Sequence, residues 1–198
     1  MSTLIQHSGA VKTGLSRRNF IKLLVCSGVL SYSSKFAFAA LDGIALKERS
    51  LSLFNPHTKE RFEGIYWCDG DYIPNALNDI NHLMRDIRTN DVKLIDTHLL
   101  DLIFSISTKL KPKTPFRVIS GYRSPKTNTL LRKSGNGAAK KSYHIRGQAV
   151  DIRLPGYRTS VLRRAAYELK KGGVGYYPKR RFVHIDVGPV RYWAEKNN

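Results

Sequence analysis

Two stretches in the middle of the chain carry apolar residues at helical spacing. The first runs over residues 75–88 and the second over residues 92–109. Apolar side chains that recur every three or four positions form one face of an amphipathic helix. We therefore expect two helices with these residues in the core: Ala76, Leu77, Ile80, Leu83, Met84 and Ile87, then Leu94, Ile95, Leu99, Leu102, Ile103 and Ile106. His82 and His98 fall within them and are expected to be packing or surface residues.

Short apolar runs that end in turn residues predict strands on both sides of these helices. They cover residues 51–54, 62–67, 116–120, 148–154, 174–177 and 182–187. The last two would form a hairpin, and residues 160–171 are typical of a helix stopped by two glycines. Most strands follow the helices instead of alternating with them. We therefore expect a single α+β domain with a small antiparallel sheet flanked by helices.

The first 39 residues contain the three parts of a bacterial export signal in the usual order. A twin-arginine pattern spans residues 16–22, a modest apolar stretch covers 23–30, and Ala37-Phe38-Ala39 resembles a cleavage site. The apolar stretch is too short for a transmembrane helix, so no stable membrane anchor is expected. We expect the twin-arginine translocase to export the chain to the periplasm, with residues 1–39 removed and 40–198 forming the mature domain.

Basic residues greatly outnumber acidic ones. The chain has 34 Lys and Arg against 15 Asp and Glu, a formal charge of +19. Loss of the signal would leave +14, because residues 1–39 hold five basic and no acidic residues. Nucleic acid is a common partner of such a charge. Export argues against nucleic acid and favours the polyanions of the cell envelope, although the charge could also serve solubility alone.

Strand alternation brings three chemically active side chains to one side of the sheet. Successive side chains of a strand point to opposite faces. Asp151 in the 148–154 strand, and His184 and Asp186 in the 182–187 strand, therefore lie opposite their apolar neighbours. His144 precedes the first of these strands, and Gly147 would let the chain turn so that His144 and Asp151 converge. Two imidazoles and one carboxylate form the ligand set of a catalytic zinc, but solvated side chains would give the same pattern.

Several spaced motifs resemble one family of zinc peptidases. Residues 142–151, SYHIRGQAVD, match every fixed position of the S-x-H-x-x-G-x-A-x-D signature of the LAS enzymes. These comprise lysostaphin-type enzymes, D-Ala-D-Ala carboxypeptidases and proteins of the hedgehog fold. Residues 120–124, SGYRS, are similar to an element of the D,D-peptidase branch, and 172–177 and 182–188 complete the set. The whole resembles the exported murein endopeptidases of the MepK (YcbK-like) family, which implies a hedgehog/D-Ala-D-Ala carboxypeptidase-like fold.

The resemblance implies roles for individual residues. His144, Asp151 and His184 take the positions of the zinc ligands, for one Zn²⁺ per chain. Arg123 falls where the family places an arginine near the scissile carbonyl or a substrate carboxylate; a structural ion pair is the alternative. The expected substrate-binding residues are Tyr122, Tyr143 and Ser142, with core packing as the alternative for the two tyrosines.

The expected base is a departure from the family pattern. Many relatives place a Glu three residues, or a His two residues, before the last zinc ligand. Arg181 and Phe182 occupy those positions here, and neither side chain can accept the proton. Asp186 is the expected substitute, acting on the water, on the metal or as a support for a ligand.

The motifs predict a zinc-dependent endopeptidase that hydrolyses the peptide cross-links of peptidoglycan, with stem peptides as its substrate. A D,D-carboxypeptidase acting on the same polymer is one alternative. A non-catalytic module of the same fold, binding the wall or a metal, is another. A polyanion-binding or nuclease-like protein is the third, suggested only by the charge.

Overall fold

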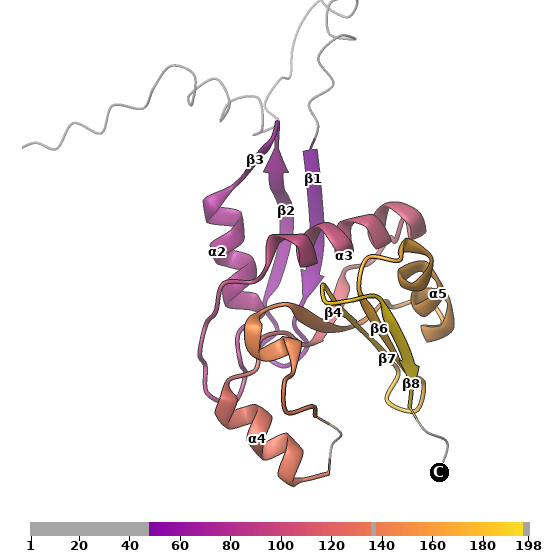
Figure 1. Ribbon diagram of the computed structural model, residues 1–198. Helices are drawn as coiled ribbons and strands as arrows, with labels where there is room; N and C mark the ends of the chain where they lie inside the picture. The colour runs from indigo at the N-terminus through magenta and orange to yellow at the C-terminus, as the bar shows by residue number, and fades with distance from the viewer. Residues whose placement is uncertain (1–47, 136–137, 196–198) are drawn as a thin grey trace, which may run out of the picture. The chain divides into compact units, whose positions relative to one another are not determined.

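The structure is a computed structural model that describes residues 48–135 and 138–195. All of these residues belong to one compact unit, Leu46–Asn198. The export signal predicted for residues 1–39 lies outside the described residues. Helices and strands both contribute to the unit, which confirms the expected α+β class (Figure 1).

One sheet of eight strands organises the unit, in the order β3-β2-β1-β4-β5-β7-β6-β8. The strands are β1 Glu48–Phe54, β2 Arg61–Cys68, β3 Asp71–Tyr72, β4 Phe116–Ser120, β5 Ala149–Arg153, β6 Gly173–Tyr177, β7 Phe182–Asp186 and β8 Arg191–Ala194. Most neighbours are antiparallel, including the expected β6–β7 hairpin, but β1–β4 and β6–β8 are parallel. The sheet is therefore larger than expected and mixed, and β3 and β8 are additions to the predicted strands.

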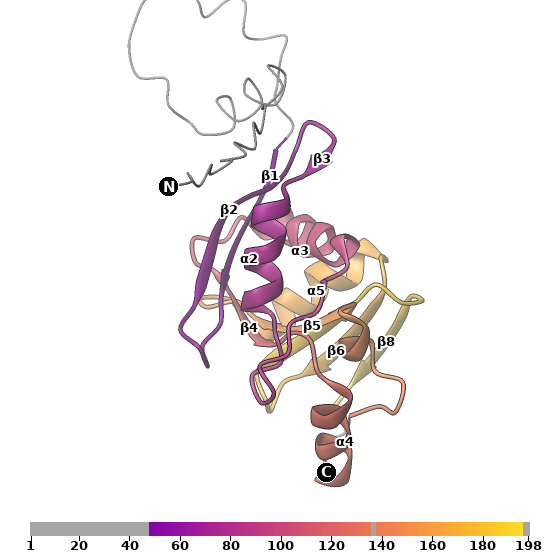
Figure 2. The ribbon, with the colours of Figure 1, turned by 90° about the vertical axis from the view of Figure 1, so that its left-hand side faces the viewer.

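Four α-helices accompany this sheet in the described part of the chain: α2 Pro74–Leu83, α3 Thr97–Leu110, α4 Pro125–Lys133 and α5 Thr159–Leu169. Helices α2, α3 and α5 lie between the β1–β2 strands on one side and the β6–β8 strands on the other (Figure 2). Their apolar faces and the inward side chains of the strands form a single core. Helix α4 lies apart from the other three in both views.

The two central helices are shorter than their apolar spacing predicts. Helix α2 ends at Leu83 and α3 begins only at Thr97. The loop between them exposes two residues expected in the core, Ile87 and Leu94, the latter 77% exposed. Asp96 sets the start of α3, because its carboxylate accepts a backbone N–H from the first turn of the helix. His82 and His98 lie at the surface, in agreement with the sequence prediction.

The loop after α2 supports the SGYRS segment. The carbonyl of Met84 accepts the backbone N–H of Tyr122 at 2.7 Å. The buried carboxylate of Asp86 accepts the backbone N–H of Ser124 at 2.7 Å and that of Arg88 at 2.9 Å. Gly121 lies so close to Met84 that a Cβ atom would collide with the backbone. The loop after α2 thus fixes the path of the chain that follows β4.

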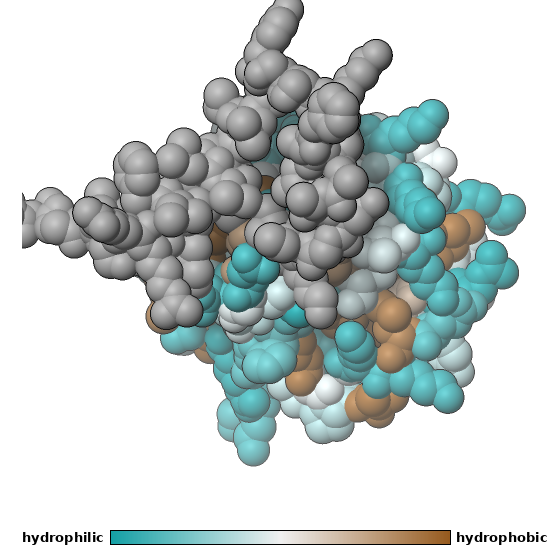
Figure 3. All heavy atoms as spheres, turned by 90° about the horizontal axis from the view of Figure 1, so that it is seen from above, coloured by the Kyte–Doolittle hydropathy of each residue, from teal (hydrophilic) through white to brown (hydrophobic). Residues whose placement is uncertain are grey.

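Hydrophilic residues predominate on the part of the surface that is coloured in Figure 3. Apolar residues appear there as separate patches among hydrophilic ones. Within residues 48–135 and 138–195, no helix combines the length and the apolar character needed to cross a membrane.

We predict that Asp86→Ala lowers the free energy of unfolding by about 1–3 kcal/mol at pH 7, because buried backbone donors lose their acceptor. Burial alone would raise the pKa of Asp86, but the hydrogen bonds it accepts hold that pKa to about 2. A lowered pKa gives stability that is fully present above the unfolded value of about 3.9 and is lost as the pH falls through about 2. The difference between wild type and variant should therefore shrink in acid.

Urea denaturation at pH 7 and at pH 3 measures both effects. Asp79→Ala is the matched control, since Asp79 is exposed on α2 and its loss should change stability by less than about 0.5 kcal/mol. Equal destabilisation by the two substitutions would contradict the supporting role of Asp86.

Candidate active site

Two neighbouring strands and a short helix bring three predicted residues together. Asp151 of β5 lies directly opposite His184 of β7 in the antiparallel register. His144 lies in a 3₁₀ helix, Tyr143–Arg146, that ends at Gly147. Gly147 has a φ of 71°, in the left-handed region that glycine adopts readily, and there the chain turns toward β5. The convergence expected from alternation and from Gly147 is confirmed.

Three side-chain atoms of these residues converge. His184 Nδ1 lies 2.9 Å from Asp151 Oδ1, and His144 Nε2 lies 3.1 Å from His184 Nδ1. His144 Nε2 lies 3.3 Å from the same Asp151 oxygen. His144 and Asp151 are buried and His184 nearly so. This is the one group of three or more His, Cys, Asp or Glu side chains within the described ranges that could hold a metal ion.

The outward nitrogen of each imidazole is occupied by an acceptor. His144 Nδ1 faces the carbonyl oxygen of Gly121 at 2.7 Å and therefore carries its proton there. His184 Nε2 donates to Asp186 Oδ2 at 2.9 Å. Each ring can therefore keep a proton on its outward nitrogen and offer its inward nitrogen to a metal ion, which is the tautomer that a metal ligand requires.

Asp186 lies behind His184, away from Asp151. It is fully buried, and its oxygens also accept hydrogen bonds from the backbone N–H of Gly188 and from both terminal nitrogens of Arg191, at 2.7–3.0 Å. Burial would raise the pKa of Asp186, but the hydrogen bonds from His184 and Arg191 outweigh it and hold the pKa to about 2. Asp186 is therefore in place to orient His184, and not beside the three converging atoms, where the expected base would act.

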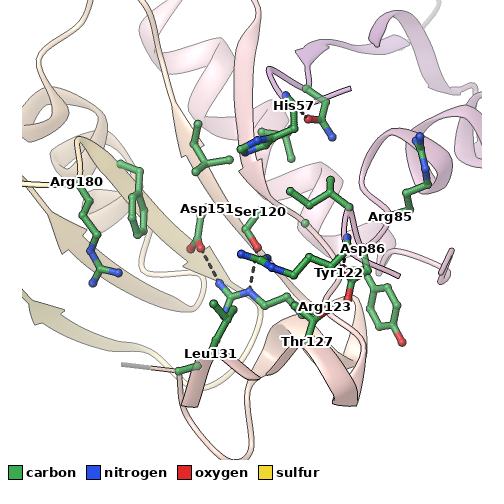
Figure 4. Close-up of a pocket in the computed structure, with 18 residues that line it drawn as sticks. His57, Arg85, Asp86, Ser120, Tyr122, Arg123, Thr127, Leu131, Asp151 and Arg180 are labelled. Atoms are coloured by element: carbon green, nitrogen blue, oxygen red, sulfur yellow. Dashed lines mark hydrogen bonds and ion pairs between the residues drawn. The ribbon is translucent and has the colours of Figure 1, made fainter. Parts of the chain in front are cut away.

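Arg123 holds the other oxygen of Asp151. Its Nη2 donates to Asp151 Oδ2 at 2.7 Å, and its Nε donates to Ser120 Oγ at 2.9 Å. Figure 4 shows Arg123 extending between these two residues. The ion pair predicted as the alternative role of Arg123 is thus present, and it leaves Oδ1 of Asp151 to face the imidazoles.

Burial and neighbouring charges act in opposite directions on this cluster. Burial lowers the pKa of His144, which favours the neutral ring. Burial alone would raise the pKa of Asp151, yet its interactions with the two histidines hold it well below the ordinary value. Burial would lower the pKa of His184, but its hydrogen bonds to Asp151 and Asp186 outweigh burial and raise it. Asp151 is therefore an ionised carboxylate beside a neutral His144, which is the protonation state that a divalent cation would meet.

Two cavities meet at the cluster. The first has a volume of about 310 Å³ and includes Ser120, Tyr122 and Asp86 in its wall (Figure 4). The second has a volume of about 410 Å³ and contains both histidines. Five residues line both cavities: Arg123, Ala138, Asp151, Arg180 and Phe182. The cluster thus lies in a groove that continues on either side of Arg123 and Asp151.

The three residues predicted to bind substrate all line this groove. Tyr122 lies in the first cavity, and Tyr143 and Ser142 lie in the second. Tyr143 packs under the guanidinium of Arg191, 4.9 Å from its ring centre. Their position fits the predicted role, which stays a prediction.

The last strand supplies two site residues whose roles the sequence did not predict. Arg191 pairs with Asp186, and the ring of Trp193 lies 5.2 Å from that of His184. Trp193 fits because Gly175, on the neighbouring strand, has no side chain: a Cβ there would lie 2.5–2.7 Å from the indole. Both residues follow the final motif closely, which is the signal that could have identified them.

We predict that Gly175→Ala displaces Trp193 from His184 and lowers the free energy of unfolding by about 1–3 kcal/mol, the usual cost of overpacking. Tryptophan fluorescence and thermal unfolding would measure the two effects. Gly64→Ala in β2 is the matched control, because a Cβ at Gly64 meets only ordinary contacts with Phe62. An unchanged emission spectrum for Gly175→Ala would contradict the contact.

A family model and two known relatives of this chain share one description. A family model described as Peptidoglycan L,D-endopeptidase MepK matches residues 43–193. The Peptidoglycan L,D-endopeptidase MepK of Escherichia coli strain K12 is 42% identical over 175 residues, covering 87% of this chain and 95% of that protein. The Probable peptidoglycan L,D-endopeptidase MepK of Haemophilus influenzae is 41% identical over 148 residues, covering 74% of this chain and 80% of that protein.

A solved structure of Serratia marcescens L-Ala D-Glu endopeptidase ChiX also resembles part of the chain. It is 20% identical, has a TM-score of 0.34, and covers 47% of this chain and 80% of that one. A likeness at this level carries no argument about fold or function.

Proposed function

Since the chain belongs to the family of the peptidoglycan L,D-endopeptidase MepK, we propose that it is a zinc-dependent hydrolase of peptidoglycan cross-links that cuts an L,D peptide bond. The observation that carries the proposal is the convergence of His144 Nε2, Asp151 Oδ1 and His184 Nδ1 in a groove where two cavities meet. The names of the relatives favour the L,D bond over a D,D-carboxypeptidase reaction.

His144, Asp151 and His184 are the proposed holders of the zinc ion. Two imidazole nitrogens and one carboxylate oxygen are the donors of many catalytic zinc sites, which leave a position open for water. The fit is good in this chain, because the outward nitrogen of each imidazole faces an acceptor and the inward nitrogen faces the other two ligand atoms. The chemistry that zinc supplies when bound is the polarisation of a carbonyl and the activation of water near neutral pH.

The surrounding residues hold protons and charges in place for this chemistry. Asp186 Oδ2 keeps the proton on His184 Nε2, and the Gly121 carbonyl keeps that of His144 on Nδ1. Arg123, at the junction of the two cavities, is the proposed partner of the scissile carbonyl oxygen or of a substrate carboxylate. A guanidinium suits both tasks, since it binds carboxylates in a two-pronged manner and stabilises a developing oxyanion.

The groove supports an endopeptidase. A cross-link continues on both sides of the bond that is cut, so its site must be open in both directions. The two cavities on either side of Arg123 and Asp151 offer such a path, with volumes of about 310 and 410 Å³. Tyr122 on one side and Tyr143 on the other are proposed to contact the stem peptides.

One observation favours a second candidate, a non-catalytic module that binds the wall or a metal. Asp151 is the only acidic residue in the wall of the cavity that holds the histidines, as far as the described residues go. Asp186 is occupied by His184 and Arg191. Among the residues that the structure describes, no second carboxylate beside the three converging atoms is therefore in place to take a proton from water.

The place of action follows from the proposed substrate. Peptidoglycan lies outside the inner membrane, so we propose a periplasmic protein that reaches its substrate by twin-arginine export. The expected partners are stem peptides and, during export, the twin-arginine translocase; nucleic acid is not among them. The basic charge suits a polymer rich in carboxylates.

We predict that the purified protein converts cross-linked muropeptide dimers to monomers with zinc and not with a chelator. His144→Ala should fall to the level of the chelated protein, because one ligand and its hydrogen bond to Gly121 are lost. His98→Ala is the matched control, since His98 lies at the surface and its loss should leave turnover unchanged. Mass spectrometry of the monomers identifies the bond.

Each outcome separates the candidates. Free D-alanine as the product would move the assignment to a carboxypeptidase. Bound zinc without any turnover would favour the non-catalytic module. Cleavage by His144→Ala at the wild-type rate would exclude the proposed site.

We also predict that Asp186→Asn weakens zinc binding by about 10–100-fold, the usual effect of losing a carboxylate partner of a metal-binding histidine. Competition with a chromophoric chelator measures the affinity, and turnover at saturating zinc should largely recover. Asp79→Asn is the control on the surface of α2. If Asp186→Asn binds zinc normally but has no turnover at saturating zinc, Asp186 acts in the chemical step after all.

A further inference from the structure

Three arginines meet in a cavity outside the groove. The cavity has a volume of about 240 Å³, and Arg117, Arg153 and Arg181 all line it. Arg117 of β4 and Arg153 of β5 are register partners, and Arg181 belongs to the turn that joins β6 to β7. None of the nine residues in its wall is acidic.

Such a cluster is unfavourable without a counter-ion. Guanidinium groups stay protonated in proteins, and like charges directly opposite each other on neighbouring strands destabilise a sheet. Arg153 donates from Nη2 to the carbonyl of Arg180 at 2.7 Å, while its Nε is buried and has no hydrogen-bond partner. A buried donor without a partner costs free energy. An anion in the cavity would offset the repulsion between the arginines and could accept the hydrogen bond of Arg153 Nε.

The first turn of α5 adds further donors. Helix α5 starts at Thr159, which lines the same cavity, and its N-terminus has neither a side-chain cap nor an acidic residue in the first turn. The N-terminus of a helix presents unpaired N–H groups and a partial positive charge, so anions bind there readily. The helix and the three arginines are independent features that favour the same kind of ligand.

We propose that this cavity is an oxyanion site that binds one carboxylate or phosphate group between Arg117, Arg153 and Arg181. Planar guanidinium groups bind both kinds of oxyanion in a two-pronged manner. Arg153 follows Asp151 by two residues on the same side of β5, so the site lies about 7 Å along the strand from Asp151. An envelope polymer that carries anionic groups can therefore be held beside the groove.

The test uses the purified full-length protein and two probes, inorganic phosphate and acetate, each at an ionic strength matched with chloride. The Nε–Hε resonance of Arg153 in an NMR spectrum should shift and saturate with the probe that binds. Arg117→Gln and Arg181→Gln alter exposed side chains and should weaken that affinity at least about tenfold, as loss of a charge-assisted contact does. Arg164→Gln on the outer face of α5 removes the same charge and should leave the affinity unchanged.

Saturation by phosphate alone identifies a phosphate-bearing ligand, and saturation by acetate identifies a carboxylate; either supports the site. A shift that does not saturate with either probe, or equal weakening by Arg164→Gln, overturns it, because the effect would then be that of the general surface charge. The readout involves no turnover. Failure of this site and failure of the proposed hydrolase are therefore distinguishable.

Discussion

The register between β5 and β7 is the constraint on which the candidate site depends. Asp151 lies opposite His184, while Val150 and Ile152 of β5, with Ile185 of β7, point into the core. A slip of one residue would turn every apolar side chain out and every polar one in. The burial of the core thus fixes the site: the same contacts that stabilise the sheet hold an acid and an imidazole within hydrogen-bond distance.

The loop after α2 also helps to position the cluster, through the SGYRS segment. Met84 and Asp86 hold the backbone of the SGYRS segment, and the carbonyl of Gly121 in that segment accepts the outward proton of His144. The path from the loop after α2 to His144 therefore consists of hydrogen bonds that each include a backbone group, which leave little freedom for the ring. Because Gly121 packs against Met84 without room for a Cβ, this path also depends on a glycine that the family motif contains.

The sequence predicted the features that depend on local alternation and missed those that depend on tertiary contacts. The face shared by Asp151 and His184 follows from period-two patterning, and the turn before β5 follows from Gly147. The ends of α2 and α3 did not follow from apolar spacing, because polar groups such as the Asp96 cap decide them. Strand β8 has only four residues and pairs in parallel with β6, so no local pattern reveals it.

The contact that Asp186 makes with His184 also depends on a tertiary interaction and could not be predicted from the sequence. Alternation puts Asp186 on the face of His184 but cannot say which ring nitrogen it contacts. The ion pair with Arg191 from β8 fixes the position of the Asp186 carboxylate. A fully buried carboxylate needs such a positive partner to stay ionised. Once it is ionised and held by Arg191, Asp186 accepts the proton of His184 Nε2, and the ring thereby turns Nδ1 toward Asp151. Asp186, which the sequence predicted as the base, therefore orients the imidazole of His184.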